Sequence, residues 1–194
     1  MNGLDPIGEH LITEELNEST GFHVLASRKV GEWQTKFQKL EIYETPHYGR
    51  MMRLDGCNTT SEREEFVYHE NLIHPALTAH AAPRKVLIIG GGDGGSSEEA
   101  LKHASVEQVT MCEIDPDVIQ VAKEHFHAVH QGAFDSPRVR VLVGAGMKFV
   151  RETQERFDLI ALDLNDPMGP TEPLYSTEFF QQCRHALAPG GALV

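Results

Sequence analysis

Apolar and polar positions follow two different patterns along the chain. In the first pattern single apolar residues alternate with polar ones, so that Leu40 and Ile42 are separated by a glutamate. Turn signals such as Asp55-Gly56 follow these segments. Alternation with a period of two, bounded by turns, is typical of short antiparallel strands. We therefore expect a small, β-rich N-terminal domain over residues 1–61.

Beyond Pro83, short apolar runs alternate with segments whose pattern is typical of helices. The expected strands are 86–89, 109–112, 139–143 and 159–162, with a fifth starting at 192. The expected helices between them are 97–103, 117–127, 147–155 and 177–187. Strands that alternate with helices indicate an α/β fold with a parallel, doubly wound sheet. We assign this domain to residues 62–194 and expect it to be truncated at its C-terminus, because the chain stops as the last strand begins.

A further helix is expected between the two domains' sheets, from about residue 62 to residue 80. Ser61 is the expected N-cap, and the glutamates that follow suit the positive end of the helix dipole. Pro75 interrupts this segment. Because proline removes a backbone donor and crowds the preceding turn, we expect the helix to be kinked or split there.

Charge narrows the range of partners. Acidic residues outnumber basic ones by 29 to 17, which gives a formal net charge of −12. Nucleic acids and anionic membranes both favour clustered Lys and Arg, so we expect neither as a partner. The three cysteines form no disulfide framework and fit a reducing cytoplasm. Residues 1–5 have no signal-peptide pattern.

A glycine-rich loop follows the first strand of the second domain. Gly90, Gly92 and Gly95 have the G-x-G-x-x-G spacing, and Glu113 ends the next strand, where an acidic residue would hold a ribose diol. Asp93 lies inside the loop and would repel a pyrophosphate. The loop therefore favours a nucleoside with a positive charge, a sulfonium of the S-adenosylmethionine kind, over a dinucleotide.

A second group of polar residues follows the fourth strand. Asp163 and Asp166 come at the carboxyl edge of the sheet, where open α/β sheets bind their ligands. Taken alone, the two aspartates also fit a capped turn. Because they face a glycine loop that has its own acid, we interpret them as part of a cleft that binds cations.

These segments together resemble the spermidine synthases, the polyamine aminopropyltransferases. The matching segments run in the same order as in that family: Phe37-Gln38, Tyr48-Gly49-Arg50, Leu54-Asp55-Gly56, 64–70, 86–95, Glu113-Ile114-Asp115 and 163–170. The resemblance implies a Rossmann-like, methyltransferase-type sheet preceded by a small antiparallel β domain. It implies transfer of an aminopropyl group from decarboxylated S-adenosylmethionine to putrescine, without a cofactor or metal. It also implies a homodimer or homotetramer.

The resemblance also implies a role for individual residues. Asp163 matches the proposed general base, and Asp166 matches a residue that binds the amine. Asp93 matches a residue that meets the amino group of the donor, and Glu113 one that holds its ribose. Three further residues match positions that line the donor and acceptor pockets: Gln38, Tyr68 and His69.

The chain departs from the family pattern at a few positions. Ala145 stands where the family usually has an aspartate that accepts a hydrogen bond from the adenine, and losing such an acceptor removes roughly 1–3 kcal/mol of binding. Thr59 replaces a common glutamine in what we expect to be a loop, and Glu98 a frequent arginine. A catalytically impaired paralogue that binds polyamine or nucleoside therefore stays open, as does an S-adenosylmethionine-dependent methyltransferase.

Histidine spacing gives no metal-binding motif. His69 and His74 are five residues apart rather than four, so they do not share one face of a helix. We expect no metal site in this chain.

Overall fold

The computed structural model describes residues 10–167 and 169–194, which form two units divided between Glu65 and Phe66. The expectation for residues 1–5 lies outside the described residues, as does Met168. Among the described residues, no helix combines the length and the apolar character needed to cross a membrane. Each unit has its own sheets, described separately below.

The N-terminal unit consists of antiparallel strands, as its alternating pattern predicts. Its strands are β1 (His10–Asn17), β2 (Thr20–Ala26), β3 (Arg28–Gln34), β4 (Lys39–Thr45), β5 (Gly49–Leu54) and β6 (Cys57–Ser61). The first two form a hairpin, and the other four form a sheet in sequence order. Leu40, Ile42 and Met52 are fully buried. The polar residues that alternate with these apolar ones on β4 are not all exposed, however: Glu41 is buried as well.

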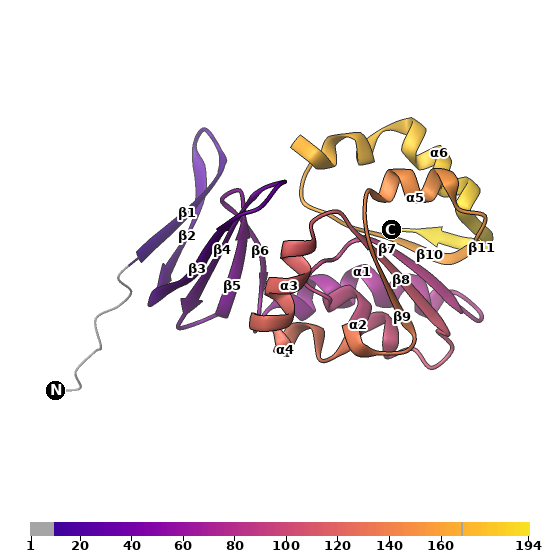
Figure 1. Cartoon of the computed structure of the whole chain (residues 1–194), viewed down its shortest axis with the longest axis horizontal. Helices are drawn as coiled ribbons and strands as arrows, with labels where there is room; N and C mark the ends of the chain where they lie inside the picture. The colour runs from indigo at the N-terminus through magenta and orange to yellow at the C-terminus, as the bar shows by residue number, and fades with distance from the viewer. Residues whose placement is uncertain (1–9, 168) are drawn as a thin grey trace. The chain divides into compact units, whose positions relative to one another are not determined.

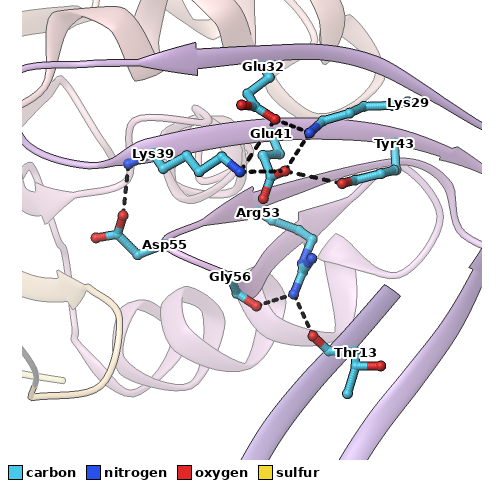
Figure 2. Close-up of polar contacts among 9 residues, drawn as sticks. All are labelled: Thr13, Lys29, Glu32, Lys39, Glu41, Tyr43, Arg53, Asp55 and Gly56. Atoms are coloured by element: carbon cyan, nitrogen blue, oxygen red, sulfur yellow. Dashed lines mark hydrogen bonds and ion pairs between the residues drawn. The ribbon is translucent and has the colours of Figure 1, made fainter. Parts of the chain in front are cut away.

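Two lysines compensate for the buried charge of Glu41. Its Oε1 lies 2.6 Å from Lys29 Nζ and 3.1 Å from Lys39 Nζ, and it accepts a hydrogen bond of 3.1 Å from the Tyr43 hydroxyl (Figure 2). Burial raises the pKa of Glu41, but these hydrogen bonds outweigh it and hold the pKa at about 2. Nearby, the Arg53 side chain connects β5 to β1 by donating a 2.8 Å hydrogen bond to the Thr13 carbonyl oxygen. Ion pairs therefore connect the strands on their polar side.

The C-terminal unit contains a five-stranded parallel sheet. Its strands are β7 (Lys85–Gly90), β8 (Gln108–Glu113), β9 (Val139–Val143), β10 (Phe157–Asp163) and β11 (Leu187–Leu193). They are arranged in the order β11-β10-β7-β8-β9, and every neighbouring pair is parallel. The chain thus adds β8 and β9 on one side of β7 and then adds β10 and β11 on its other side. This confirms the expected doubly wound, Rossmann-like sheet.

Helices cover both faces of this sheet. They are α1 (Glu65–Ala79), α2 (Gly95–Leu101), α3 (Pro116–His125), α4 (His127–His130), α5 (Gly146–Glu152) and α6 (Thr177–Ala186), with 3₁₀ segments η1 (Ala133–Asp135) and η2 (Gly169–Tyr175). Figure 1 shows α5 and α6 on one side of the sheet and α1, α2 and α4 on the other. The α5–α6 side has a core that includes Leu87, Ile160, Phe157 and Phe179. Burial on both faces explains why these strands appear in the sequence as continuous apolar runs.

Three expectations about element boundaries are wrong. Ser61 ends β6 and does not cap α1, which begins only at Glu65. The helix is also not split at Pro75 but continues to Ala79, because Ile73 and Leu77 are both buried and their packing outweighs the loss of one backbone hydrogen bond. The last strand begins at Leu187 rather than at residue 192, since Leu187 already pairs with Phe157 of β10; the register then shifts, and pairing resumes at Ala192.

Candidate active site

The carboxyl ends of three parallel strands place the candidate site. β7 ends at Gly90, β8 at Glu113 and β10 at Asp163. Asp163 lies directly beside Gly90 in the register of the sheet. Because the strand order reverses at β7, a crevice opens at these ends, which is where ligands of such sheets bind. The fold therefore brings together two groups of residues that are about 70 positions apart in sequence.

The glycine loop packs directly against the end of β10. The Gly91 amide donates a 3.1 Å hydrogen bond to the Asp163 carbonyl oxygen. Gly90 has a φ of +83°, and a Cβ there would come within 2.0 Å of the same oxygen. Only glycine permits both the conformation and the close approach. The glycines thus hold Asp163 against the loop.

Three titratable side chains converge beside this loop. His69 comes from α1, Asp93 from the loop after β7, and Asp163 from the end of β10. His69 Nε2 lies 3.4 Å from Asp93 Oδ2 and 3.9 Å from Asp163 Oδ2. One ligand atom from each residue lies within 4.8 Å of the others. Two carboxylates at this spacing create a local negative field that can hold an ammonium group or a metal ion.

Asp163 is a buried carboxyl group whose surroundings shift its pKa. Its Oδ2 is buried and has no hydrogen-bond partner within residues 10–167 and 169–194. Burial raises the pKa of Asp163; the charge of His69 lowers it, and that of Asp93 raises it further. A carboxylate with a raised pKa is a stronger base than an ordinary one, so this group is suited to accept a proton.

The backbone of α2 fixes the positions of Asp93 and His69. Asp93 Oδ1 accepts a 3.0 Å hydrogen bond from the Gly95 amide, which leaves Oδ2 on the side of His69. A Cβ on Gly95 would lie 2.3 Å from the His69 ring. The absence of a side chain at Gly95 therefore lets the imidazole approach the loop closely.

Tyr68 and Tyr175 add hydroxyl groups near these acids. The rings of Tyr68 and His69 pack edge to face, with centroids 5.3 Å apart. Burial of the hydroxyl raises the pKa of Tyr68, and the charge of Asp163 raises it further, although about half of the residue's surface is exposed. Tyr175 also raises the pKa of Tyr68 electrostatically, and the charge of Asp166 raises the pKa of Tyr175. Sequence reasoning missed Tyr175, whose only signal is its place shortly after the aspartate pair.

Glu113 lies at the end of β8, beside the glycine loop. It is buried beside the loop, and a Cβ on Gly92 would lie 3.0 Å from its Oε2. Its Oε1 accepts a 2.8 Å hydrogen bond from the Asp115 amide. Burial raises the pKa of Glu113 to about 7. One carboxylate oxygen is thus held by the backbone while the other faces the glycine loop.

The remaining predicted residues are not all part of this cluster. Asp166 is exposed, and its carbonyl accepts a hydrogen bond from Thr171 at 2.6 Å. Ala145 is exposed at the N-cap of α5 and supplies no capping side chain. Thr59 lies in β6 rather than in a loop, which corrects that expectation. Gln38 and Thr59 both belong to the N-terminal unit, so the role of Gln38 stays a prediction.

Family models match both units of the chain. A model described as "Spermine/spermidine synthase domain" matches residues 65–194, and one described as "Spermidine synthase tetramerisation domain" matches residues 12–62. The two matches meet close to the division between the structural units.

Individual relatives and solved structures agree with these matches. A polyamine aminopropyltransferase of Nitrosomonas europaea is 43% identical over 188 residues, which cover 96% of this chain and 58% of the relative. Polyamine aminopropyltransferase 1 of Pseudomonas aeruginosa is 48% identical and covers 93% of this chain and 63% of the relative. A crystal structure of spermidine synthase with the transition-state analogue AdoDATO superimposes with a TM-score of 0.90 at 37% identity, covering 96% of this chain and 64% of that one. The chain thus spans about three fifths of the length of these relatives.

Proposed function

The chain belongs to the spermine/spermidine synthase family, and from that premise we propose that it is a polyamine aminopropyltransferase. The proposed reaction transfers an aminopropyl group from decarboxylated S-adenosylmethionine to putrescine and gives spermidine and methylthioadenosine. The observation that carries the proposal is the convergence of Asp93 and Asp163 on His69 beside the glycine loop. Both substrates are cations, and this site is lined by carboxylates.

The chemistry requires a base for the acceptor amine. An alkylammonium has a pKa near the ~10.4 of lysine and has no lone pair with which to attack. In the proposed mechanism Asp163 accepts a proton from that ammonium, and its raised pKa suits this role. The amine nitrogen then attacks the carbon next to the sulfonium, the C–S bond breaks, and the sulfur keeps the bonding electrons as neutral thioether. Because sulfonium is already a good leaving group, the step needs no resident cofactor or metal.

We assign each of the other site residues to the binding of one of the two substrates. We assign Asp93 to the amino group of the donor, Glu113 to its ribose, and the loop at Gly90 and Gly92 to close approach of the nucleoside. For the acceptor we assign Asp166 and the Tyr68 hydroxyl, and Gln38 stays a prediction from the resemblance. Support comes from the shared location of Asp93, Glu113 and Asp163 at the strand ends. His69 separates the two aspartates and limits their repulsion.

One observation favours a second candidate function, binding without turnover. Ala145 is exposed where an acceptor for the adenine amino group is expected, and it offers no side-chain oxygen. A weakened donor site would leave a protein that binds polyamine but transfers aminopropyl groups slowly. The two candidates differ in turnover rather than in which ligands bind.

We also propose that the protein forms homo-oligomers in the cytoplasm. The match of residues 12–62 to a tetramerisation domain supports assembly, as do the exposed apolar side chains Leu11 and Leu25, which face each other across the β1–β2 hairpin. No disulfide joins Cys57, Cys112 or Cys183 in the described part of the chain, and unbridged cysteines suit a reducing compartment.

A product assay tests the proposed function. The chain is incubated with decarboxylated S-adenosylmethionine and putrescine, and spermidine and methylthioadenosine are measured by mass spectrometry. We expect both products in equal amounts, and at least a hundredfold lower rate in Asp163→Asn. Calorimetry with putrescine and methylthioadenosine runs beside it: binding without turnover would support the second candidate. Transfer of a methyl group from S-adenosylmethionine to an acceptor, with release of S-adenosylhomocysteine, would instead indicate a methyltransferase and contradict the proposal.

A further inference from the structure

A second cluster of ionisable side chains lies between α1 and α2, outside the candidate active site. Glu70 and His74 are four residues apart on α1 and therefore share one face of the helix. They meet Glu99 of α2, and one ligand atom from each of the three residues lies within 4.8 Å of the others. Sequence reasoning considered His69 with His74, whereas in the structure His69 lies beside Asp93 and Asp163 and His74 lies with Glu70 and Glu99.

Glu99 carries the strongest signal for a bound cation. The residue is 1% exposed, and its Oε1 is held by Lys102 Nζ at 2.8 Å. Its Oε2 is also buried but accepts no hydrogen bond within the described part of the chain, although His74 Nε2 lies only 3.0 Å away. Lys102 already compensates this carboxylate at Oε1, so the unfavourable atom is Oε2, which is buried without a hydrogen bond. Two ligand atoms that approach without hydrogen bonding to each other are the arrangement expected around one metal ion.

His103 holds the other side of the His74 ring. Its Nε2 lies 2.9 Å from His74 Nδ1, so one of these nitrogens donates and the other accepts. When His74 donates from Nδ1, its Nε2 carries a lone pair 3.0 Å from Oε2 of the Glu99 carboxylate. A metal ion at that point turns a repulsive contact into two coordination bonds. Histidines that bind metals commonly have such a partner on the second ring nitrogen, which fixes the tautomer.

From this arrangement we propose that Glu70, His74 and Glu99 form a site for one divalent transition-metal ion of the Zn²⁺ kind. One imidazole and two carboxylates suit Zn²⁺, and three protein ligands leave a fourth position for water. Glu70 is exposed, so its side chain can turn to complete the site. The two carboxylates balance the charge of the ion. The ion would join α1 to α2, the helix that begins at the end of the glycine loop.

Zinc binding to matched variants tests this proposal. The metal-free chain is titrated with Zn²⁺ by calorimetry, and Co²⁺ is added separately to record the visible absorption of a tetrahedral site. We expect one equivalent of Zn²⁺ to bind. We expect about tenfold or greater weakening in His74→Gln and in Glu70→Gln, with loss of the Co²⁺ bands. Glu70→Gln changes an exposed side chain, so it keeps the test valid if His74→Gln fails to fold.

His69→Gln is the matched control, since it removes the neighbouring histidine from the other group that could hold an ion. We expect Zn²⁺ affinity in this variant to remain unchanged. If His69→Gln abolishes binding while His74→Gln and Glu70→Gln preserve it, the ion occupies the candidate active site and the proposal is wrong. The absence of saturable binding at one equivalent would also overturn it. These experiments do not test the proposed aminopropyl transfer, because they measure metal binding and not turnover.

Discussion

Single residues in the candidate site are governed by burial as much as by charge. Asp163 and Glu113 both have a raised pKa for the same leading reason, which is removal from water. Burial likewise raises the pKa of Cys112 to about 11 and that of Cys183 to about 12, so neither thiol is a ready nucleophile at neutral pH. The acids differ from these thiols because they lie at strand ends, where a cationic substrate can relieve the unfavourable charge.

Glu113 gives a prediction for stability against pH. Its pKa rises from 4.5 in an ordinary glutamate to about 7 in the folded chain, so the folded state keeps a proton that the unfolded state loses. Stability therefore falls as the pH rises from about 4.5 to about 7, by at most roughly 3 kcal/mol from this group. We expect Glu113→Gln to flatten this slope. Urea denaturation at pH 5 and pH 8 measures it, and equal slopes in parent and variant would refute the assignment. Asp163 contributes to both proteins, so the difference isolates Glu113.

Ala145 gives a prediction for donor binding. Ala145→Asp supplies a cap for α5, which has none, and should raise stability by about 0.5–2 kcal/mol. If the family role of this position applies, the same carboxylate should tighten methylthioadenosine binding by roughly 5- to 150-fold. Thermal denaturation and calorimetry measure the two effects. Ala145→Ser is the control because it caps the helix with a shorter side chain. Equal affinity in the two variants would argue against an adenine contact.

At the scale of elements, the N-terminal sheet depends on a buried ion network. Lys29 and Lys39 share two carboxylates, the buried Glu41 and the exposed Glu32; Glu41→Gln removes the buried one, so we expect a loss of about 1–3 kcal/mol in the stability of this unit. The native pKa of Glu41 is lowered, so its contribution is present above about pH 4.5 and is lost as the pH falls toward 2. Glu44→Gln, at an exposed pair with Arg28, should change stability by less than about 1 kcal/mol. Denaturant unfolding compares them, and equal losses would show that burial does not matter here.

Elements were predictable where one physical signal dominated. The apolar runs of β7, β8 and β10 are mostly buried, so composition identified them, and the edge strand β9 was found from its valines although it is only partly buried. The strands β1, β2 and β3 carry many exposed residues, such as Leu11 and Phe22, and gave no regular alternation. Pro75 was misjudged because local propensity opposed a helix that tertiary packing stabilises.

At the scale of the whole molecule, assembly is the main prediction. The exposed pair Leu11 and Leu25 is apolar and cross-strand, so burying it against another copy would be favourable. We expect the double variant Leu11→Glu, Leu25→Glu to shift the protein toward monomers in light scattering. Arg151→Glu on α5 makes the same change in net charge at an exposed position and should leave the assembly intact. An unchanged mass in the double variant would exclude this hairpin as the contact.

The sequence by itself determined the class of fold and the glycine loop and led to the proposal of a cationic ligand, because apolar runs, glycine spacing and an acid inside the loop are local signals. Only the tertiary structure decided which acids act together. It placed Asp163 beside Asp93 and His69 and left Asp166 exposed, although the two aspartates are three residues apart. It also separated His69 from His74 and gave the second histidine to Glu99. Proximity across a parallel sheet depends on strand order and register, and no local pattern in the chain encodes these directly.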